Sequence, residues 1–116
     1  MRILMVALAA TLLAGCAGSV MDDARTRTPY KVMTSDKPEK NVAQCVQFGW
    51  QDEAVFGVDA AAYLEPRKQG GTTVYTRSAE SFVDVTTGPS GTTLNYYVQK
   101  DDFVAKRRLA ALATCL

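Results

Sequence analysis

The residues with the widest chemical range in this 116-residue chain are its three cysteines, Cys16, Cys45 and Cys115. A cysteine thiolate can attack an electrophile or bind a metal, and two cysteines can form a disulfide. The chain contains no histidine, which excludes Ser-His-Asp and Cys-His nucleophiles as well as histidine-based metal sites. It also has no Cys-x-x-Cys pair, so a reactive or metal-binding thiol pair is the weaker interpretation of the cysteines.

The acidic and small polar residues offer little catalytic chemistry. Hydrolysis by paired carboxylates needs two acids held across a cleft, and Asp84 is the one acid that the pattern places in the middle of a strand. Glu65 and Glu80 fall next to turns, and all three acids are expected to be solvated strand or loop residues. The stretch GPSG at 88–91 is one residue short of G-x-S-x-G and is typical of a hairpin turn. We therefore expect a protein that is not an enzyme and that needs no metal or cofactor.

The first sixteen residues have the character of a targeting signal. Arg2 precedes about eleven apolar or small residues at 3–13, which is roughly half the ~20 residues that a membrane-spanning helix requires. The run then ends in the letters LAGC at 13–16. The alternatives are a buried first helix of the fold and a plain secretory signal cut at a small-residue site.

The LAGC motif closely resembles the lipobox of bacterial lipoproteins. The resemblance implies that residues 1–15 are a signal peptide, that the chain is cut before Cys16, and that Cys16 carries the lipid as its membrane attachment. Two or more acyl chains hold a protein firmly to a bilayer. Ala17 follows the cysteine, where an Asp would favour the inner membrane, so the resemblance implies the periplasmic face of the outer membrane.

Lipidation of Cys16 changes the meaning of the other two cysteines. Cys45 and Cys115 are then an even pair in an oxidising compartment, which favours a disulfide. It would close a loop of roughly 70 residues, worth about 4 kcal/mol in the chain-entropy model. The chain has 13 basic and 12 acidic residues. Loss of Arg2 with the signal leaves it neutral, which argues against a nucleic-acid partner.

Hydrophobic periodicity predicts a small α+β domain over residues 36–116. Val42, Cys45 and Val46 share one face of a predicted helix at 37–51. A second helix is predicted at 103–115, with Lys106, Arg107 and Arg108 pointing largely to solvent. Between the helices, alternating segments bounded by turns, among them those at 66–71 and 88–91, predict strands at 60–65, 72–77, 81–87 and 92–99. We expect a four-stranded antiparallel meander with both helices on one face, in the order α-β-β-β-β-α.

The segment before this domain, residues 16–35, is predicted to be the lipidated N-terminus and a flexible tether. It shows no sustained hydrophobic period, although its last few residues could form a short edge strand. A flexible tether of this length would have an r.m.s. reach of about 25 Å.

Strand parity divides the predicted sheet into two unlike faces. The aliphatic face, which we expect under the helices, collects Ala60, Ala62, Leu64, Val74, Val83, Val85, Leu94, Tyr96 and Val98. The other face collects the aromatic residues Tyr63, Tyr75, Phe82 and Tyr97. Aromatic side chains are enriched in the cores of protein interfaces, so this face is the candidate partner-binding surface. The alternatives are that the N-terminal segment or a loop covers it, or that the parity is off by one residue.

Nearly the whole mature chain resembles small uncharacterised envelope lipoproteins of proteobacteria, in which a helix with a cysteine and a following tryptophan precedes a four-stranded meander and a final helix ends in cysteine. The matching residues are Val42-Ala43-Gln44-Cys45, Trp50, Val83-Asp84-Val85, Tyr96-Tyr97 and Cys115-Leu116. The motifs of this resemblance are structural, so it implies no function. We expect a non-enzymatic envelope protein that binds another protein or a cell-wall component. The alternative is a periplasmic inhibitor or immunity protein that blocks a hydrolase or a toxin.

Overall fold

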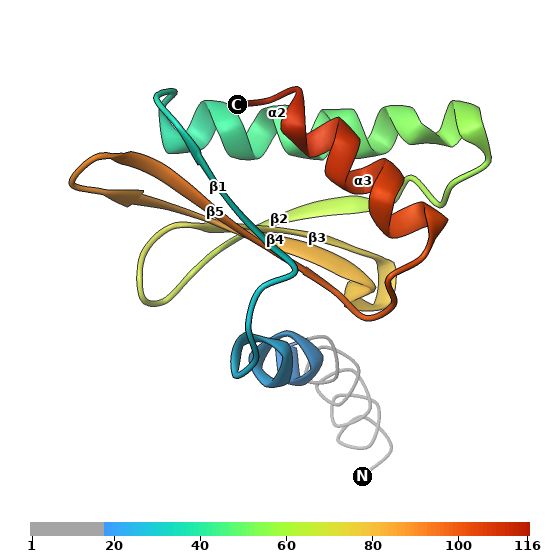
Figure 1. The fold of residues 1–116 in the computed structure, drawn as a ribbon, viewed down its shortest axis with the longest axis horizontal. Coiled ribbons are helices and arrows are strands. Elements are labelled where there is room, and N and C mark those ends of the chain that lie inside the picture. Colours follow the sequence, from blue (N-terminus) through green and yellow to red (C-terminus); the bar gives the residue numbers. More distant parts are fainter. Residues whose placement is uncertain (1–17) are drawn as a thin grey trace, which may run out of the picture.

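The computed structural model describes residues 18–116 as three layers, with helices on both sides of one sheet (Figure 1). The predicted signal peptide at 1–15 and the predicted lipidation of Cys16 lie outside the described residues. Residues 18–25 are helical, and we call them the N-terminal segment. The remaining elements are β1 (Lys31–Ser35), α2 (Glu39–Asp52), η1 (Glu53–Phe56), β2 (Ala62–Pro66), β3 (Thr72–Thr76), η2 (Arg77–Ala79), β4 (Ser81–Gly88), β5 (Gly91–Val98) and α3 (Phe103–Ala113).

The sheet has five antiparallel strands in the order β1-β5-β4-β3-β2. The α+β class and the antiparallel meander are confirmed, whereas the count of four strands is wrong because β1 adds a fifth. Residues 31–35 pair with β5 along its free edge, from Lys31 opposite Tyr96 to Ser35 opposite Thr92. Backbone groups make this pairing, so it needs little hydrophobic patterning in β1 itself.

The remaining boundaries lie within two residues of the predicted ones. At the start of β2, residues 60 and 61 belong to the preceding loop, where an Asp59 carboxylate oxygen accepts a hydrogen bond from the Ala61 amide at 3.1 Å. Such a local side-chain contact favours a turn over a strand. The described helices of residues 18–116 are all too short or too polar to cross a bilayer.

The main hydrophobic core lies between the sheet and the pair α2 and α3. It is formed by Val42, Ala43, Val46, Trp50, Ala62, Val74, Val83, Val85, Leu94, Tyr96, Leu112 and Cys115. Most of the predicted aliphatic face is therefore buried as expected. Leu64 is an exception at 40% exposure, because it lies on β2, one of the two edge strands of the sheet.

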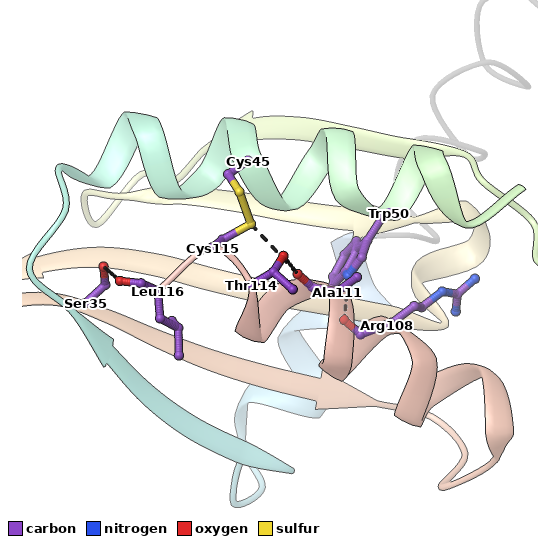
Figure 2. Close-up of a disulfide and its surroundings, with 8 residues drawn as sticks. All are labelled: Ser35, Cys45, Trp50, Arg108, Ala111, Thr114, Cys115 and Leu116. Carbon is purple, nitrogen blue, oxygen red and sulfur yellow. Dashed lines mark hydrogen bonds between the residues drawn. A yellow bond between two sulfur atoms is a disulfide. The ribbon is translucent and has the colours of Figure 1, made fainter. Parts of the chain in front are cut away.

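A disulfide between Cys45 and Cys115 joins α2 to the residues after α3, as predicted (Figure 2). The two Cα atoms are 5.7 Å apart and the cysteines are separated by 70 residues. Nearby, the Ser35 hydroxyl donates a hydrogen bond to the Leu116 carbonyl at 3.0 Å. Together these contacts fix the end of the chain to both α2 and β1.

Candidate functional site

The four aromatic residues predicted to share one sheet face form a single row across four strands. Cα pairing places Tyr63 on β2 opposite Tyr75 on β3, Tyr75 opposite Phe82 on β4, and Phe82 opposite Tyr97 on β5. The ring centroids of Tyr63 and Tyr75 are 5.3 Å apart, and those of Phe82 and Tyr97 are stacked at 4.7 Å. We call these four residues the aromatic row.

The two halves of the aromatic row differ in exposure. Tyr63 is 44% exposed and Tyr75 is half-buried, whereas Phe82 is only 1% exposed and Tyr97 is also buried. The N-terminal segment covers the second half, where Met21 and Ala24 pack against the rings. The expectation that all four side chains face water is therefore wrong for Phe82 and Tyr97, and the covering by the N-terminal segment is the correct alternative there.

An ion pair between the half-buried Arg25 and the buried Asp84 holds the N-terminal segment on the sheet. Asp84 lies in the middle of β4 and is 2% exposed. The Arg25 guanidinium donates to both of its carboxylate oxygens, with Nε to Oδ2 at 2.8 Å and Nη2 to Oδ1 at 2.9 Å. The Thr73 hydroxyl donates to Oδ1 at 2.7 Å. Such bidentate, charge-assisted hydrogen bonds are among the strongest in proteins.

These contacts correct two expectations about the N-terminal half of the chain. Residues 18–25 are docked on the sheet and residues 31–35 are a strand, so a flexible tether is wrong for both segments. Asp84, expected as an ordinary solvated strand residue, instead lies beneath the N-terminal segment. The physical reason is that Asp84 is buried, and a buried carboxylate requires a cationic partner. Arg25 supplies it, and the hydrogen bond to Asp84 raises the pKa of Arg25.

The more exposed half of the aromatic row, Tyr63 with Tyr75, which we call the open half, offers binding chemistry. Burial raises the pKa of Tyr75, and it does the same for Tyr97 under the N-terminal segment. The phenol of Tyr75, in the open half, therefore stays neutral at physiological pH, so it can pack through its ring and exchange hydrogen bonds through its hydroxyl.

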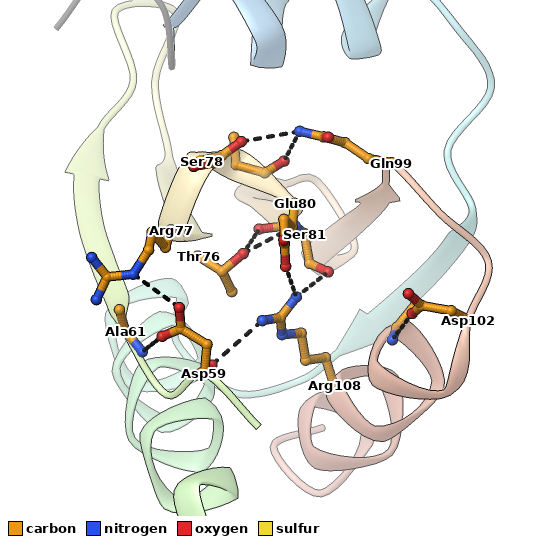
Figure 3. Close-up of polar contacts among 12 residues, drawn as sticks. Asp59, Ala61, Thr76, Arg77, Ser78, Glu80, Ser81, Gln99, Asp102 and Arg108 are labelled. Atoms are coloured by element: carbon orange, nitrogen blue, oxygen red, sulfur yellow. Dashed lines mark hydrogen bonds and ion pairs between the residues drawn. The ribbon is translucent and has the colours of Figure 1, made fainter. Parts of the chain in front are cut away.

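A second polar cluster lies at the far end of the sheet, where α3 meets η2 and the start of β4 (Figure 3). Its centre is Arg108, which is 3% exposed, so the expectation that Arg108 points to solvent is wrong. The helical spacing contains the signal that was missed. Arg108 lies three residues after Ala105 and four before Leu112, and all three are the buried residues of α3.

Comparison with protein-family models, curated proteins and solved structures finds no match to this chain.

Proposed function

We propose that this protein is a lipoprotein anchored through Cys16 to the periplasmic face of the outer membrane, where it acts as a non-enzymatic binding or structural protein of the envelope. The LAGC motif supports the anchor. The disulfide adds support, because it uses the other two cysteines and is the kind of bond that persists in oxidising compartments.

The observation that carries the binding role is the open half of the aromatic row, Tyr63 with Tyr75. Paired tyrosines present large ring surfaces together with hydroxyls, and they lose little conformational entropy on binding. This combination suits a protein surface or the ring faces of a cell-wall sugar.

The proposed anchor also sets where this surface acts. Residue 18, two positions after Cys16 in the sequence, already lies in a helix, and Arg25 and Met21 attach that helix to the sheet. The folded domain would therefore be held close to the bilayer, without the 25 Å reach expected of a flexible tether. Its partner would be a component that comes near the membrane surface.

A pull-down from envelope extract tests the binding role. The full-length chain, purified in detergent, is compared with the double variant Tyr63→Ala, Tyr75→Ala and with Phe48→Ala, an exposed aromatic residue on α2 that serves as the matched control. We expect the double variant to lose the partner and Phe48→Ala to retain it. Retention of every partner by the double variant refutes the role of this surface. Recovery of a hydrolase or toxin, inhibited on binding, would assign the inhibitor function.

Intact mass of the detergent-extracted protein tests the anchor separately. We expect a chain that begins at Cys16 and carries acyl groups, and we expect Cys16→Ser to remain uncut and without lipid. An unmodified Cys16 in the native protein would contradict the lipoprotein assignment whatever the pull-down gives.

A further inference from the structure

We propose that the cavity between the start of α3 and the η2 turn is a binding site for a small carboxylate, with Arg108 as the residue that recognises it. The cavity has a volume of about 310 Å³, and Arg108 lines it together with Ser81, Glu80 and Val104. This site is formed by Ser81 and residues of α3 and does not include Tyr63 or Tyr75. It also does not depend on the proposed membrane anchor.

The hydrogen bonds of Arg108 are incomplete for a buried guanidinium. Nη1 donates to the Ser81 hydroxyl oxygen at 3.1 Å and reaches Glu80 Oε2 at 3.4 Å, and Nη2 reaches the Asp59 carbonyl at 3.4 Å. A guanidinium has five N–H donors, so two have no acceptor among residues 18–116. Every buried side-chain nitrogen in this part of the chain has a partner, so the unpartnered Nε is open to solvent and to a ligand. Charge-assisted hydrogen bonds are normally 2.7–2.9 Å long, so the 3.4 Å contacts are weak.

The charge partner of Arg108 is also poorly placed. Glu80 is the single carboxylate in salt-bridge range of Arg108 within residues 18–116, and its own side chain is 60% exposed. A buried cation whose counter-ion sits in water has lost hydration without gaining a full ion pair. A carboxylate entering the cavity would displace the loosely held Glu80 and bind the planar guanidinium through two parallel hydrogen bonds.

The surroundings hold the donor in place. The Trp50 indole N–H donates to the Arg108 carbonyl at 2.9 Å, which fixes this turn of α3 against α2. Ser81, which accepts from Arg108, lies 3.4 Å from the hydroxyl oxygen of Tyr96, and Tyr96 in turn donates to the Ala105 carbonyl at 2.9 Å. A fixed donor loses little freedom when a ligand binds.

The turn that precedes Ser81 is held in an unusual backbone conformation. Ser78 and Ala79 have φ values of 58° and 51°, in the left-handed region that residues with a side chain rarely adopt. The Gln99 side-chain amide donates to the carbonyls of both residues at 3.0 Å (Figure 3). This bracing sets the directions in which Glu80 and Ser81 leave the turn, at the wall of the cavity.

The remaining charges of the cavity indicate which carboxylates fit best. Lys100 adds a second cation and Asp102 a second carboxylate. One oxygen of Asp102 caps α3 by accepting from the Ala105 amide at 2.9 Å. A ligand that carries an ammonium group beside its carboxylate, such as a free amino acid, could therefore pair its carboxylate with Arg108 and its ammonium with the carboxylate of Asp102.

Titration of the ¹⁵N-labelled full-length protein in detergent with sodium acetate tests the site, with sodium chloride as the salt control. We expect saturable shifts of the Arg108 Nε–H and Val104 amide signals that chloride does not produce. Arg108→Lys should weaken acetate binding at least tenfold, because lysine cannot form two parallel bonds. Glu80→Gln should tighten binding several-fold, because it removes the competing carboxylate. Arg107→Lys, which alters the neighbouring arginine paired with Glu53, should leave binding unchanged.

Three results would overturn the proposal. They are shifts with acetate no larger than with chloride, weaker or unchanged binding by Glu80→Gln, and tighter binding of methylammonium than of acetate at the same signals. Glu80 is exposed, so its variant decides the question even where Arg108→Lys does not fold. Titration with glycine and with N-acetylglycine then identifies which kind of carboxylate the site binds. Tighter binding of glycine than of acetate assigns a free amino acid, and tighter binding of N-acetylglycine assigns the C-terminus of a peptide.

Discussion

Removal of the Arg25 side chain should destabilise the protein far more than removal of Arg27, although both arginines lie near the start of the chain and both form ion pairs. Arg25 donates two hydrogen bonds to the carboxylate of Asp84, whose side chain is 3% exposed. Arg27 pairs with Asp23 at the surface, where both side chains are about two-thirds exposed or more. The comparison therefore separates the effect of burial from the effect of charge.

The expected magnitudes follow from the contacts. Breaking a buried ion pair by removing one partner costs about 3–5 kcal/mol. Two contacts to Asp84 survive in Arg25→Ala, the Thr73 hydroxyl and the Arg67 guanidinium, whose Nε lies 3.6 Å from Oδ1. We therefore expect a loss of about 2–3 kcal/mol for Arg25→Ala. Exposed pairs contribute about 0–1 kcal/mol, so we expect less than about 0.5 kcal/mol for Arg27→Ala.

Urea unfolding followed by circular dichroism measures the free energy of unfolding of both variants under the same conditions. Amide hydrogen exchange gives the local effect, since Arg25→Ala should raise exchange first in residues 18–25, before the rest of the sheet opens. A loss in Arg25→Ala no larger than that in Arg27→Ala would refute the reasoning. It would mean that Thr73 and Arg67 satisfy Asp84 alone and that the N-terminal segment is held by other contacts.

Three further predictions concern the body of the domain. Replacing Cys45 and Cys115 with serine opens a loop of 70 residues, which should cost about 4 kcal/mol and lower Tm by roughly 20 °C; a loss below about 1 kcal/mol in thermal unfolding would contradict it. Burial raises the pKa of Tyr96 to about 12, so its contribution to stability is complete below pH 10 and falls by about 2–3 kcal/mol as the pH rises through 12. Urea unfolding from pH 9 to 12 should show this loss, and Tyr96→Phe should flatten it; an equal alkaline slope in the variant would show that Tyr96 is not responsible. Gly70 and Gly71 both have φ above 90°, but a Cβ on Gly71 would lie 2.6 Å from a carbonyl oxygen of β4 while one on Gly70 meets open space. Gly70→Ala should therefore cost about 1 kcal/mol and Gly71→Ala at least about 2 kcal/mol in chemical unfolding, and equal losses would be inconsistent with the close approach.

The elements that the sequence predicted correctly are those governed by local patterns. Strand alternation placed Tyr63, Tyr75, Phe82 and Tyr97 on one face, and the register of the sheet aligns them as opposite partners. Turn residues at 66–71 and 88–91 separated the strands at nearly the correct positions. The pairing of Cys45 with Cys115 followed from counting cysteines once Cys16 was set aside.

Two features that the sequence offered only as alternatives, the strand at 31–35 and the covering by the N-terminal segment, depend on distant partners, and so does the burial of Arg108, which it missed. Residues 31–35 become a strand because β5 presents a free edge, and the N-terminal segment docks because Asp84, 59 residues from Arg25, needs a cation. The burial of Arg108 depends on Ser81 and the Asp59 carbonyl. None of these partners lies within a single helical or strand period, so a local pattern does not contain them.

Trp50 provides a built-in optical reporter of this structure. It is the only tryptophan of the chain, it is 1% exposed, and its ring centroid lies 6.1 Å from that of Tyr96. A shielded indole emits at shorter wavelength than a solvated one, and a tyrosine at this distance transfers excitation to it. Because the indole N–H is bonded to the Arg108 carbonyl, intrinsic fluorescence should follow both global unfolding and changes around Arg108 without any added label.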